Sequence, residues 1–490
     1  TRGKWLPTSK TFSYQWQNRK QHKLELRFVE RDSLKQTVAI AEQSDTWINL
    51  HEALVYLDDS FLWASERDGF QHIYHYDYNG KLQAQLTKGE WIVDALEGVD
   101  KNTGDVYFTG RKDTPTERHL YKVNLNKPQD ITRVSKRSGF HSITFSKDSS
   151  IYLDSYSNTA QPTQVSLHKA TGEMLTWMEQ NQVNKQHALY PYLSDWVKPR
   201  FGTLTAEDGQ TLHYRIFEPK GFKGKRPVVN YVYGGPHAQL VTNSWSSRNF
   251  ILQHLVQKGY VVFQLDNRGS YNRGKKFEDP IYQHLGDIEL KDQLVGMDYV
   301  KTLDFVDPDR IGVYGHSYGG YMTIMSMFKA GDVFKVGVSG APVTDWTLYD
   351  THYTERYAGH PGVDGKDYDK SNVFMYADGL QGVTDVQPIE APAGNYIYGD
   401  RFTYIGRVEH APQIDRTAAY LGARYNFTEA FSFTGKVTAS DLNTNTFNYT
   451  GVQFEADYYL NPYIKVFGIT SFNEDGKRHI DQRIGFEFEY

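Results

Sequence analysis

The sequence predicts a mixed fold in three parts: a partial β-propeller over residues 1–190, a doubly wound α/β domain over residues 191–382, and an antiparallel, barrel-like β meander over residues 383–490. Three observations lead to this prediction. A strand pattern repeats in the first part, apolar strands alternate with helical patterns in the second, and apolar and polar residues alternate in the third. Helical periodicity ends at the second boundary, near residue 383.

The composition limits the chemistry that the chain can support. Its 490 residues leave room for several domains, and 36 tyrosines and 27 phenylalanines favour β structure. The formal net charge of −5 gives no basic excess, so we expect no nucleic-acid partner. The chain has no cysteine, which excludes disulfides and cysteine-bound metal, and we expect no metal or other cofactor.

The beginning of the chain contains no targeting signal. The first ten residues, TRGKWLPTSK, include neither a methionine nor an apolar signal core, so we expect any secretion signal to lie outside the sequence. No run of about 18 apolar residues is present to form a transmembrane helix. The strands of a membrane β-barrel give weaker signals and stay open as an interpretation.

The first part repeats a pair of strands. Copies begin at Phe61, Val106 and Ile151, at a constant spacing of 45 residues, and a looser copy begins at Phe12. Each copy has an aromatic-rich strand, a polar turn and a second alternating strand. Because a period of roughly 40–50 residues is typical of propeller blades, we expect about four blades. An ordinary β-sandwich with a coincidental spacing is the alternative.

The second part alternates strands and helices. PVVNYVYGG (227–235) and YVVFQLDNRG (260–269) are continuous apolar runs of the kind found in buried parallel strands. Further along, Leu290, Leu294 and Met297 share one face of a predicted helix. The pattern continues with a strand over 311–315, a helix over 321–331 and a strand over 333–343.

The third part shows only strand patterns. Apolar and polar residues alternate through FSFTGKVTAS (431–440) and through the last eleven residues, and five strands of about ten residues can be drawn. Aromatic residues crowd the strand ends, which resembles the C-terminal hairpins of bacterial outer-membrane β-barrels. A soluble β-sandwich or lipocalin-like module is the alternative, because alternation does not distinguish a lipid-facing surface from a protein core.

A serine nucleophile is predicted within RIGVYGHSYGGYM (310–322). An apolar run leads into Gly-His-Ser-Tyr-Gly and a helical pattern follows, which is the strand-turn-helix context of a nucleophile elbow centred on Ser317. The two flanking glycines leave room on a strained turn where side chains would meet the neighbouring strand and helix. We expect His316 to pack rather than to act as the base, because adjacent side chains on such a turn diverge.

A second loop fits the stabilisation of an oxyanion. YVYGGPH (231–237) is a glycine-rich turn after a buried strand, and it precedes the elbow in the chain. Tyr233 would add a hydroxyl donor, and the backbone N–H of Tyr318 would be the other donor. A tight turn without a catalytic role is the alternative for this loop.

Five segments together resemble the dipeptidyl peptidase IV family, serine exopeptidases of the prolyl oligopeptidase group. The segments are VYGGPH, LDNRGSYNRG, GDIELKDQLVGMDYV, VDPDRIGVYGHSYGGYM and GAPVTDWTLYDTHYTERYAGHP. The resemblance runs from near the start of the chain to about Gly382. It implies a β-propeller joined to an α/β-hydrolase domain, and removal of dipeptides from peptide N-termini after Pro or Ala.

The resemblance also implies roles for single residues. Ser317 would be the nucleophile and Tyr233 an oxyanion donor. A flat aromatic pocket suits a proline ring, which has no N–H to satisfy. The residues implied as walls of that pocket are Tyr318, Val343, Trp346, Tyr349 and Tyr353.

Two parts of the family's machinery have no match in the sequence. We find no pair of adjacent glutamates to bind the substrate's amino terminus, and no catalytic Asp or His in the family's context. Of the later histidines, His352 and His360 fall in the pocket-forming segment. The remaining candidates for a replacement pair are Asp400 with His410 or His479, all in the third part.

From residue 383 the sequence departs from the family, so we expect an α/β-hydrolase domain that is incomplete at its C-terminal end and exposes apolar faces. Five or six strands are also too few to close a membrane barrel, for which about eight is the usual minimum. The chain therefore resembles an interior piece of a peptidase joined near residue 383 to the end of another protein. A gene fusion, an assembly error or a deliberate chimera would each produce such a join.

The leading functional hypothesis is a serine peptidase of this family whose activity is impaired because its acid and base are missing. The alternatives are an outer-membrane barrel fragment with a non-catalytic passenger and a propeller that binds peptides as a scaffold. The expected partners are a peptide with Pro or Ala at its second position, a second copy of the chain in a homodimer, and a membrane through residues 383–490. The expected location is the bacterial cell envelope, in the periplasm or outer membrane.

Overall fold

The computed structural model describes residues 2–380, apart from Ser247 and the side chains of 364–367, and the backbone of seven strands between Tyr396 and Phe488. The chain divides into two compact units, Thr1–Gln381 and Gly382–Tyr490. No helix in the described residues has both the length and the apolar character to cross a membrane.

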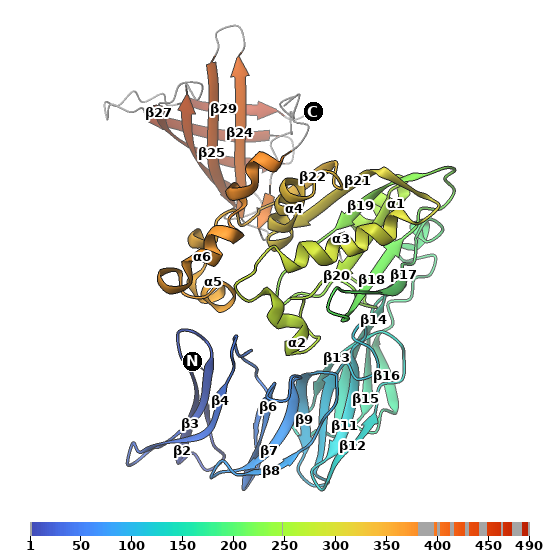
Figure 1. The fold of residues 1–490 in the computed structure, drawn as a ribbon, viewed down its shortest axis with the longest axis vertical. Helices are drawn as coiled ribbons and strands as arrows, with labels where there is room; N and C mark the ends of the chain where they lie inside the picture. Colours follow the sequence, from blue (N-terminus) through green and yellow to red (C-terminus); the bar gives the residue numbers. More distant parts are fainter. Residues whose placement is uncertain are drawn as a thin grey trace. The chain divides into compact units, whose positions relative to one another are not determined.

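Residues 2–179 form four antiparallel sheets of four strands each, drawn in blue to teal in Figure 1. In every sheet the strands follow one another in chain order. The first two sheets contain β1 (Arg2–Trp5), β2 (Thr11–Gln17), β3 (Lys23–Glu30) and β4 (Gln36–Gln43), then β5 (Leu54–Tyr56), β6 (Ser60–Ser65), β7 (His72–Asp77) and β8 (Leu82–Gln85). The other two contain β9 (Val93–Asp100), β10 (Asp105–Gly110), β11 (His119–Asn124) and β12 (Lys127–Arg133), then β13 (Phe140–Phe145), β14 (Ile151–Asn158), β15 (Gln161–Lys169) and β16 (Met174–Glu179).

Successive sheets pack face to face through alternate residues of their middle strands. On β6, Phe61 and Trp63 belong to the core shared with the first sheet, whereas Leu62 belongs to the core shared with the third. Both faces of β6 are therefore buried, which explains its uninterrupted apolar sequence. This stacking of four-stranded meanders fits the partial propeller predicted from the repeat.

The predicted repeat copies correspond to the second and third strands of each sheet. Phe12, Phe61, Val106 and Ile151 all lie at the start of a second strand. The fourth strands were not predicted, and the reason is visible on β12, which is exposed along nearly its whole length and lacks an apolar alternation.

In two of the sheets, a histidine on the third strand contacts a hydroxyl just after the end of the fourth strand. His72 Nδ1 lies 3.0 Å from Thr87 Oγ1, which also accepts a hydrogen bond from the N–H of Ile73. In the next sheet, His119 Nδ1 lies 3.1 Å from Ser135 Oγ, which accepts from the following N–H in the same way. These side chains are all buried, so the bonds satisfy polar groups that water does not reach.

The α/β domain is built on a six-stranded mixed sheet in the order β17-β18-β20-β19-β21-β22. β19 runs parallel to both β20 and β21, and β21 runs parallel to β22. The strands are β17 (Arg200–Thr205), β18 (Thr211–Phe217), β19 (Arg226–Tyr231), β20 (Val261–Asp266), β21 (Val306–His316) and β22 (Val336–Gly340). The helices are α1 (Asn249–Gln257), α2 (Lys275–Glu278), α3 (Ile288–Lys301), α4 (Tyr318–Lys329), α5 (Thr351–Ala358) and α6 (Pro361–Ser371), and short 3-10 turns include Trp346–Leu348.

The strand-turn-helix order predicted for this part is confirmed. Leu290 and Met297 are buried on α3, and Leu294 packs against the same core. β21 begins at Val306 rather than at Ile311, because an irregularity in its pairing with β19 lets the Asp-Pro-Asp segment join the strand.

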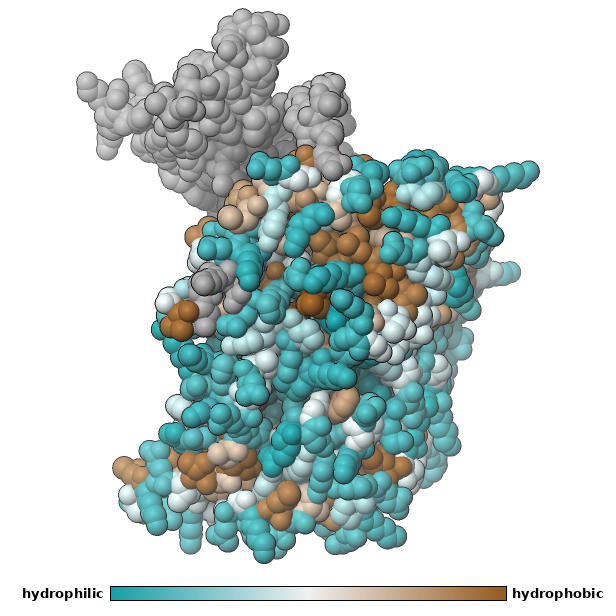
Figure 2. All heavy atoms as spheres, viewed as in Figure 1, coloured by the Kyte–Doolittle hydropathy of each residue, from teal (hydrophilic) through white to brown (hydrophobic). Residues whose placement is uncertain are grey.

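Apolar side chains are exposed at the end of this sheet. β22 is the last strand of the described sheet, and Val336 and Val338 on it are 62 % and 56 % exposed. On the face shown in Figure 2, brown spheres also gather over the α/β domain around α3 and α4. The expected exposure of apolar faces in this domain is therefore present.

The second unit is a seven-stranded antiparallel meander whose strands pair in chain order. It contains the five predicted strands and, before them, β23 and β24, which were not predicted. The strands are β23 (Tyr396–Tyr398), β24 (Phe402–Ala411), β25 (Arg416–Asn426), β26 (Phe431–Ser440), β27 (Asn448–Asn461), β28 (Ile464–Phe472) and β29 (Arg483–Phe488). The barrel-like character of this unit stays a prediction.

The buried hydroxyl of Thr87 offers a test of the sheet packing. We expect Thr87→Val to lower the free energy of unfolding by about 1–3 kcal/mol, because the N–H of Ile73 and the ring of His72 lose a buried partner. Urea unfolding followed by tryptophan fluorescence measures the change. Thr163→Val, at an exposed position on β15, is the control, and an equal effect of the two substitutions would contradict the assigned role.

Candidate active site

Ser317 lies at the turn between β21 and α4, with φ 59° and ψ −119°. A non-glycine residue rarely adopts this backbone conformation, and it is typical of a strained functional turn. The N–H of Ser317 donates to the carbonyl of Gly340 at 2.8 Å, and its own carbonyl accepts from the N–H of Tyr321 at 3.0 Å. The turn is thus held on one side by the end of β22 and on the other by the first turn of α4.

The flanking glycines are required by close backbone approach. A Cβ atom on Gly315 would meet the carbonyl oxygens of Gly319 and Val232, and one on Gly319 would also meet the carbonyl of Val232. Any side chain at either position would force β21, α4 and the end of β19 apart. The steric reason given for the glycines in the sequence is therefore seen in the structure.

The loop after β19 reaches the elbow from the other side. Gly234 has φ 79°, and its carbonyl accepts from Asn267 Nδ2 at 2.8 Å. Asn267 is itself fixed by Gln293 of α3, whose Nε2 donates to Asn267 Oδ1 at 2.9 Å. The ring of Tyr233 lies 6.0 Å from the ring of Tyr318. A Cβ atom on Gly319 would also lie 3.1 Å from the Cα of Tyr233, so the loop that carries Tyr233 lies directly against the elbow.

The predicted pocket residues form one aromatic cluster. The ring of Trp346 lies 5.4 Å from that of Tyr318, 5.8 Å from that of Tyr349 and 6.2 Å from that of Tyr353, with which it is nearly parallel. Trp346 is buried, whereas Tyr349 is 45 % exposed. Val343 packs half-buried against the same core. The cluster therefore runs from the core to the surface, as a pocket wall requires.

Tyr318 lies deeper than a simple wall residue. Its ring is 2 % exposed, and its hydroxyl donates to Glu289 Oε1 at 2.5 Å. The other oxygen of Glu289 accepts from the N–H of Gly286 at 3.0 Å. Burial raises the pKa of Glu289 to about 7, although these hydrogen bonds oppose the rise.

Sequence reasoning missed the buried polar face of α3. Besides Glu289, it carries Asp292, which forms a bidentate ion pair with Arg268 at 2.7 and 3.0 Å, and Gln293, which holds Asn267. These residues anchor the loop after β20 beneath the elbow. The signal was available, since Glu289 and Gln293 are four residues apart on the same helical face as Met297.

In the described residues of the first unit, Ser317 has neither the base nor the acid that a serine peptidase requires. Among residues 2–380, as far as they are described, no histidine or carboxylate makes a hydrogen bond with the Ser317 hydroxyl. His316 is exposed beside Gly340 rather than packed in the core, because the turn directs it outward. His352 is exposed on α5, and His360 caps α6 by accepting from the N–H of Gly362.

The proposed replacement pair lies beyond this part of the chain. Asp400, His410 and His479 are outside the residues whose side chains are described. No group of three metal-ligating side chains occurs in the described residues.

The first sheet holds the helix that carries part of the pocket. Arg19 Nε donates to Glu355 Oε2 of α5 at 2.8 Å, and Gln21 Nε2 donates to the carbonyl of His352 at 2.6 Å. On the same helix, the ring of Tyr357 lies 5.0 Å from that of Trp47. The position of Tyr353 on α5 therefore depends on contacts with the propeller sheets.

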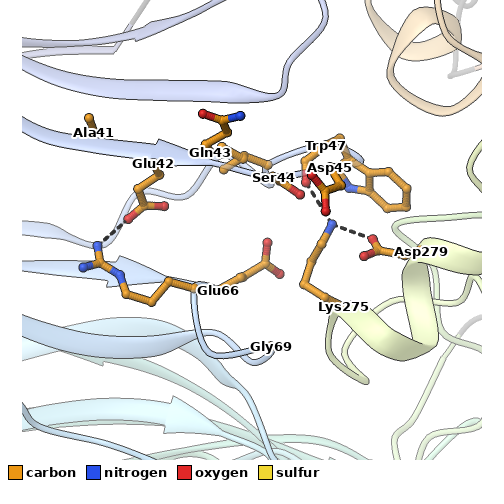
Figure 3. A pocket seen from close by; sticks show the side chains of 12 residues that line it. Ala41, Glu42, Gln43, Ser44, Asp45, Trp47, Glu66, Gly69, Lys275 and Asp279 are labelled. Atoms are coloured by element: carbon orange, nitrogen blue, oxygen red, sulfur yellow. Dashed lines mark hydrogen bonds and ion pairs between the residues drawn. The ribbon is translucent and has the colours of Figure 1, made fainter.

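A cavity of about 510 Å³ lies between the first two sheets and α2 (Figure 3). Its lining contains neither Ser317 nor a predicted pocket residue. The side chain of Lys275 extends into this cavity. Its Nζ forms an ion pair with Asp279 at 2.7 Å and donates a hydrogen bond to the carbonyl of Trp47 at 2.8 Å. Glu66 points into the same space, and the Asn49 amide bridges Glu66 and Glu278. Burial raises the pKa of both glutamates, so this contact between sheets and α/β domain is sensitive to pH.

Two family models match the chain. Residues 1–163 match the dipeptidyl peptidase IV N-terminal region, and residues 245–388 match the prolyl oligopeptidase family. Human dipeptidyl peptidase 8 is 35% identical over 391 residues, which cover 71% of this chain and 43% of that protein. Dipeptidyl peptidase 4 of Trichophyton rubrum is 31% identical over 396 residues, which cover 77% of this chain and 50% of that protein.

A solved structure is also similar. The crystal structure of Porphyromonas gingivalis dipeptidyl peptidase 4 superposes with a TM-score of 0.72 at 30% identity, over 78% of this chain and 55% of that one. The chain thus spans about half the length of the relatives it matches.

Glu289 gives the site a testable pH dependence. Its ordinary pKa is 4.5 and its pKa in the folded chain is about 7, so the folded state retains a proton that the unfolded state has lost. The free energy of unfolding should therefore fall as the pH rises from about 4.5 to about 7, by on the order of 3 kcal/mol. Burial also raises the pKa of Glu66, Glu278 and Asp266, so Glu289→Gln should remove only the share of the slope that comes from Glu289, as measured by urea unfolding across that range. Exposed Glu207→Gln is the control, and a slope in Glu289→Gln equal to that of the unsubstituted chain would disprove the assignment.

Proposed function

Because the chain belongs to the dipeptidyl peptidase IV family of serine peptidases, we propose that Ser317 is its nucleophile and that it acts on peptides with Pro or Ala at the second position. The observation that supports this proposal best is the strained turn at Ser317, held between β22 and α4 with the Tyr233 loop beside it. A backbone strain of this kind persists only where the surrounding structure enforces it.

In the proposed reaction the Ser317 oxygen attacks the carbonyl carbon of the scissile bond, the C–N bond breaks, and the hydroxyl proton leaves with the departing amine. Water then hydrolyses the resulting ester, which releases the dipeptide and restores the Ser317 hydroxyl. The N–H of Tyr318 is the first of α4 and therefore has no partner within the helix, so it is available to donate to the oxyanion. The hydroxyl of Tyr233 is proposed as the second donor. Both donors act on charge that develops only in the transition state, which is how such groups accelerate acyl transfer.

The aromatic cluster supports the proposed preference for proline. Trp346 and Tyr353 stand nearly parallel, with Tyr349 at the exposed end and Val343 beside them. A pyrrolidine ring is flat and apolar and brings no N–H that would need a partner in such a pocket. Tyr318 forms the buried base of the cluster.

We further propose that turnover is impaired in this chain. The Ser317 hydroxyl has no histidine partner among the described residues of the first unit, and a serine without its base loses several orders of magnitude in rate. Asp400 with His410 or His479 remains the replacement pair to test. The non-enzymatic alternatives are not favoured by the matches to peptidases. A homodimer, membrane contact through residues 383–490 and a cell-envelope location remain proposals from the sequence.

Hydrolysis of Gly-Pro and Ala-Pro chromogenic amides tests the proposal. We expect a kcat at least about 10³-fold below that of a peptidase with a complete triad, and loss of the residual activity in Ser317→Ala. Tyr233→Phe should lower the residual kcat by about 10²-fold, since it removes one oxyanion donor. Tyr260→Phe, a partly exposed tyrosine outside the cluster, is the matched control.

Two outcomes would contradict different parts of the proposal. Residual activity that survives Ser317→Ala would show that Ser317 is not the nucleophile. A kcat in the ordinary range of about 1–10³ s⁻¹ would show that turnover is not impaired.

A further inference from the structure

Another cavity, of about 280 Å³, lies where the third and fourth sheets meet the loop that leads from Tyr233 to α1. Arg111 and Phe140 line it from the sheets, and residues of β18, β19 and β20 line it from the α/β domain. None of the described lining residues is a carboxylate. The donors that matter here are the guanidinium groups of Arg111, Arg215 and Arg248 and the hydroxyls of Ser244 and Ser246.

Arg215 is buried with neutral hydrogen-bond partners. It is 5 % exposed, and it donates through Nε to Gln264 Oε1 at 2.6 Å and through Nη1 to the carbonyl of Thr242 at 3.0 Å. Its Nη2 has no hydrogen bond to the described residues. The carboxylate of Asp266 interacts with it electrostatically, but its two oxygens accept from the N–H groups of Leu240 and Val241.

The other two arginines differ in how their charge is balanced. Arg111 faces Asp94 at 3.2 Å and donates to Gln239 Oε1 at 2.7 Å, so a carboxylate already compensates it. Arg248 is exposed at the start of α1 and has no ion pair in the described part of the chain. Its charge acts on Tyr231, which also lines the cavity. The cavity therefore contains the buried guanidinium of Arg215, which interacts with Asp266, and the exposed guanidinium of Arg248, which has no ion pair in the described residues.

We propose that this cavity binds a small tetrahedral oxyanion of the phosphate class, held by Arg215 and Arg248 with the hydroxyls of Ser244 and Ser246. Guanidinium groups match the oxygens of phosphate in charge and geometry. At about 30 Å³ for each water molecule, the cavity has room for roughly nine, which fits a phosphate with its hydration but not a folded partner. Bound there, the anion links the loop between Tyr233 and α1 to β18.

The same chemistry is offered by free phosphate and by the phosphoryl group of a larger molecule. Calorimetric titration of the purified full chain with inorganic phosphate and with phosphoserine, at constant ionic strength, separates these sources. A lower Kd for phosphoserine would identify a phosphomonoester as the ligand, and an equal or higher Kd would identify the free anion. Saturable binding of either probe supports the site.

Charge variants test the assigned ligands. Arg248→Gln should raise the Kd for phosphate about tenfold, because one charge-assisted contact is lost. Ser246→Asp, which places a carboxylate in the cavity, should abolish binding. Arg310→Gln is the matched control, since Arg310 is exposed, pairs with Asp307 and does not line the cavity. The melting temperature of each variant in chloride shows that it is folded.

Two results would overturn the proposal. One is a phosphate titration with no saturable heat and no rise in melting temperature beyond that of chloride at equal ionic strength. The other is an equal Kd for Arg248→Gln and Arg310→Gln, which would place phosphate elsewhere on the chain.

Discussion

The strained backbone at Ser317 is the constraint on which the rest of the site depends. A positive φ at a non-glycine residue costs on the order of 1–3 kcal/mol and persists only under packing from all sides. Here the packing comes from the carbonyl of Gly340, the first turn of α4 and the carbonyl of Val232, which leaves no room for a Cβ at Gly315 or Gly319. The same close approach brings the loop of Tyr233 next to the serine.

A second layer of buried polar groups fixes the two sides of the elbow to α3. Glu289 accepts a hydrogen bond from the hydroxyl of Tyr318. Gln293 donates to the side chain of Asn267, which in turn donates to the carbonyl of Gly234. Because each of these groups is buried, removing any one of them would leave a partner unsatisfied. The propeller sheets complete the arrangement by holding α5, so the pocket depends on both parts of the first unit.

The sequence predicted the elements that carry a strong local pattern. The elbow, the parallel strands and the middle strands of the sheets were recognised because their apolar residues follow a period of two or lie in continuous runs. Exposed strands such as β12 lack that signal. The polar groups on α3 were missed because glutamate and glutamine usually lie on the exposed face of a helix, although Glu289 and Gln293 share a face with the predicted core residue Met297. The contact of Trp47 with Tyr357 joins positions too distant in sequence for any local pattern to predict.

Ser317 has the backbone of a nucleophile elbow, and no histidine or carboxylate among the described residues of the first unit bonds to its hydroxyl, so we propose that it is poised but not activated. The rate of covalent labelling by a fluorophosphonate probe, followed by mass spectrometry, tests this most directly when the Porphyromonas gingivalis relative is measured in parallel. The account predicts slow labelling confined to Ser317, several orders of magnitude below the relative and absent in Ser317→Ala. Labelling of Ser317 as fast as that of the relative's serine would contradict it.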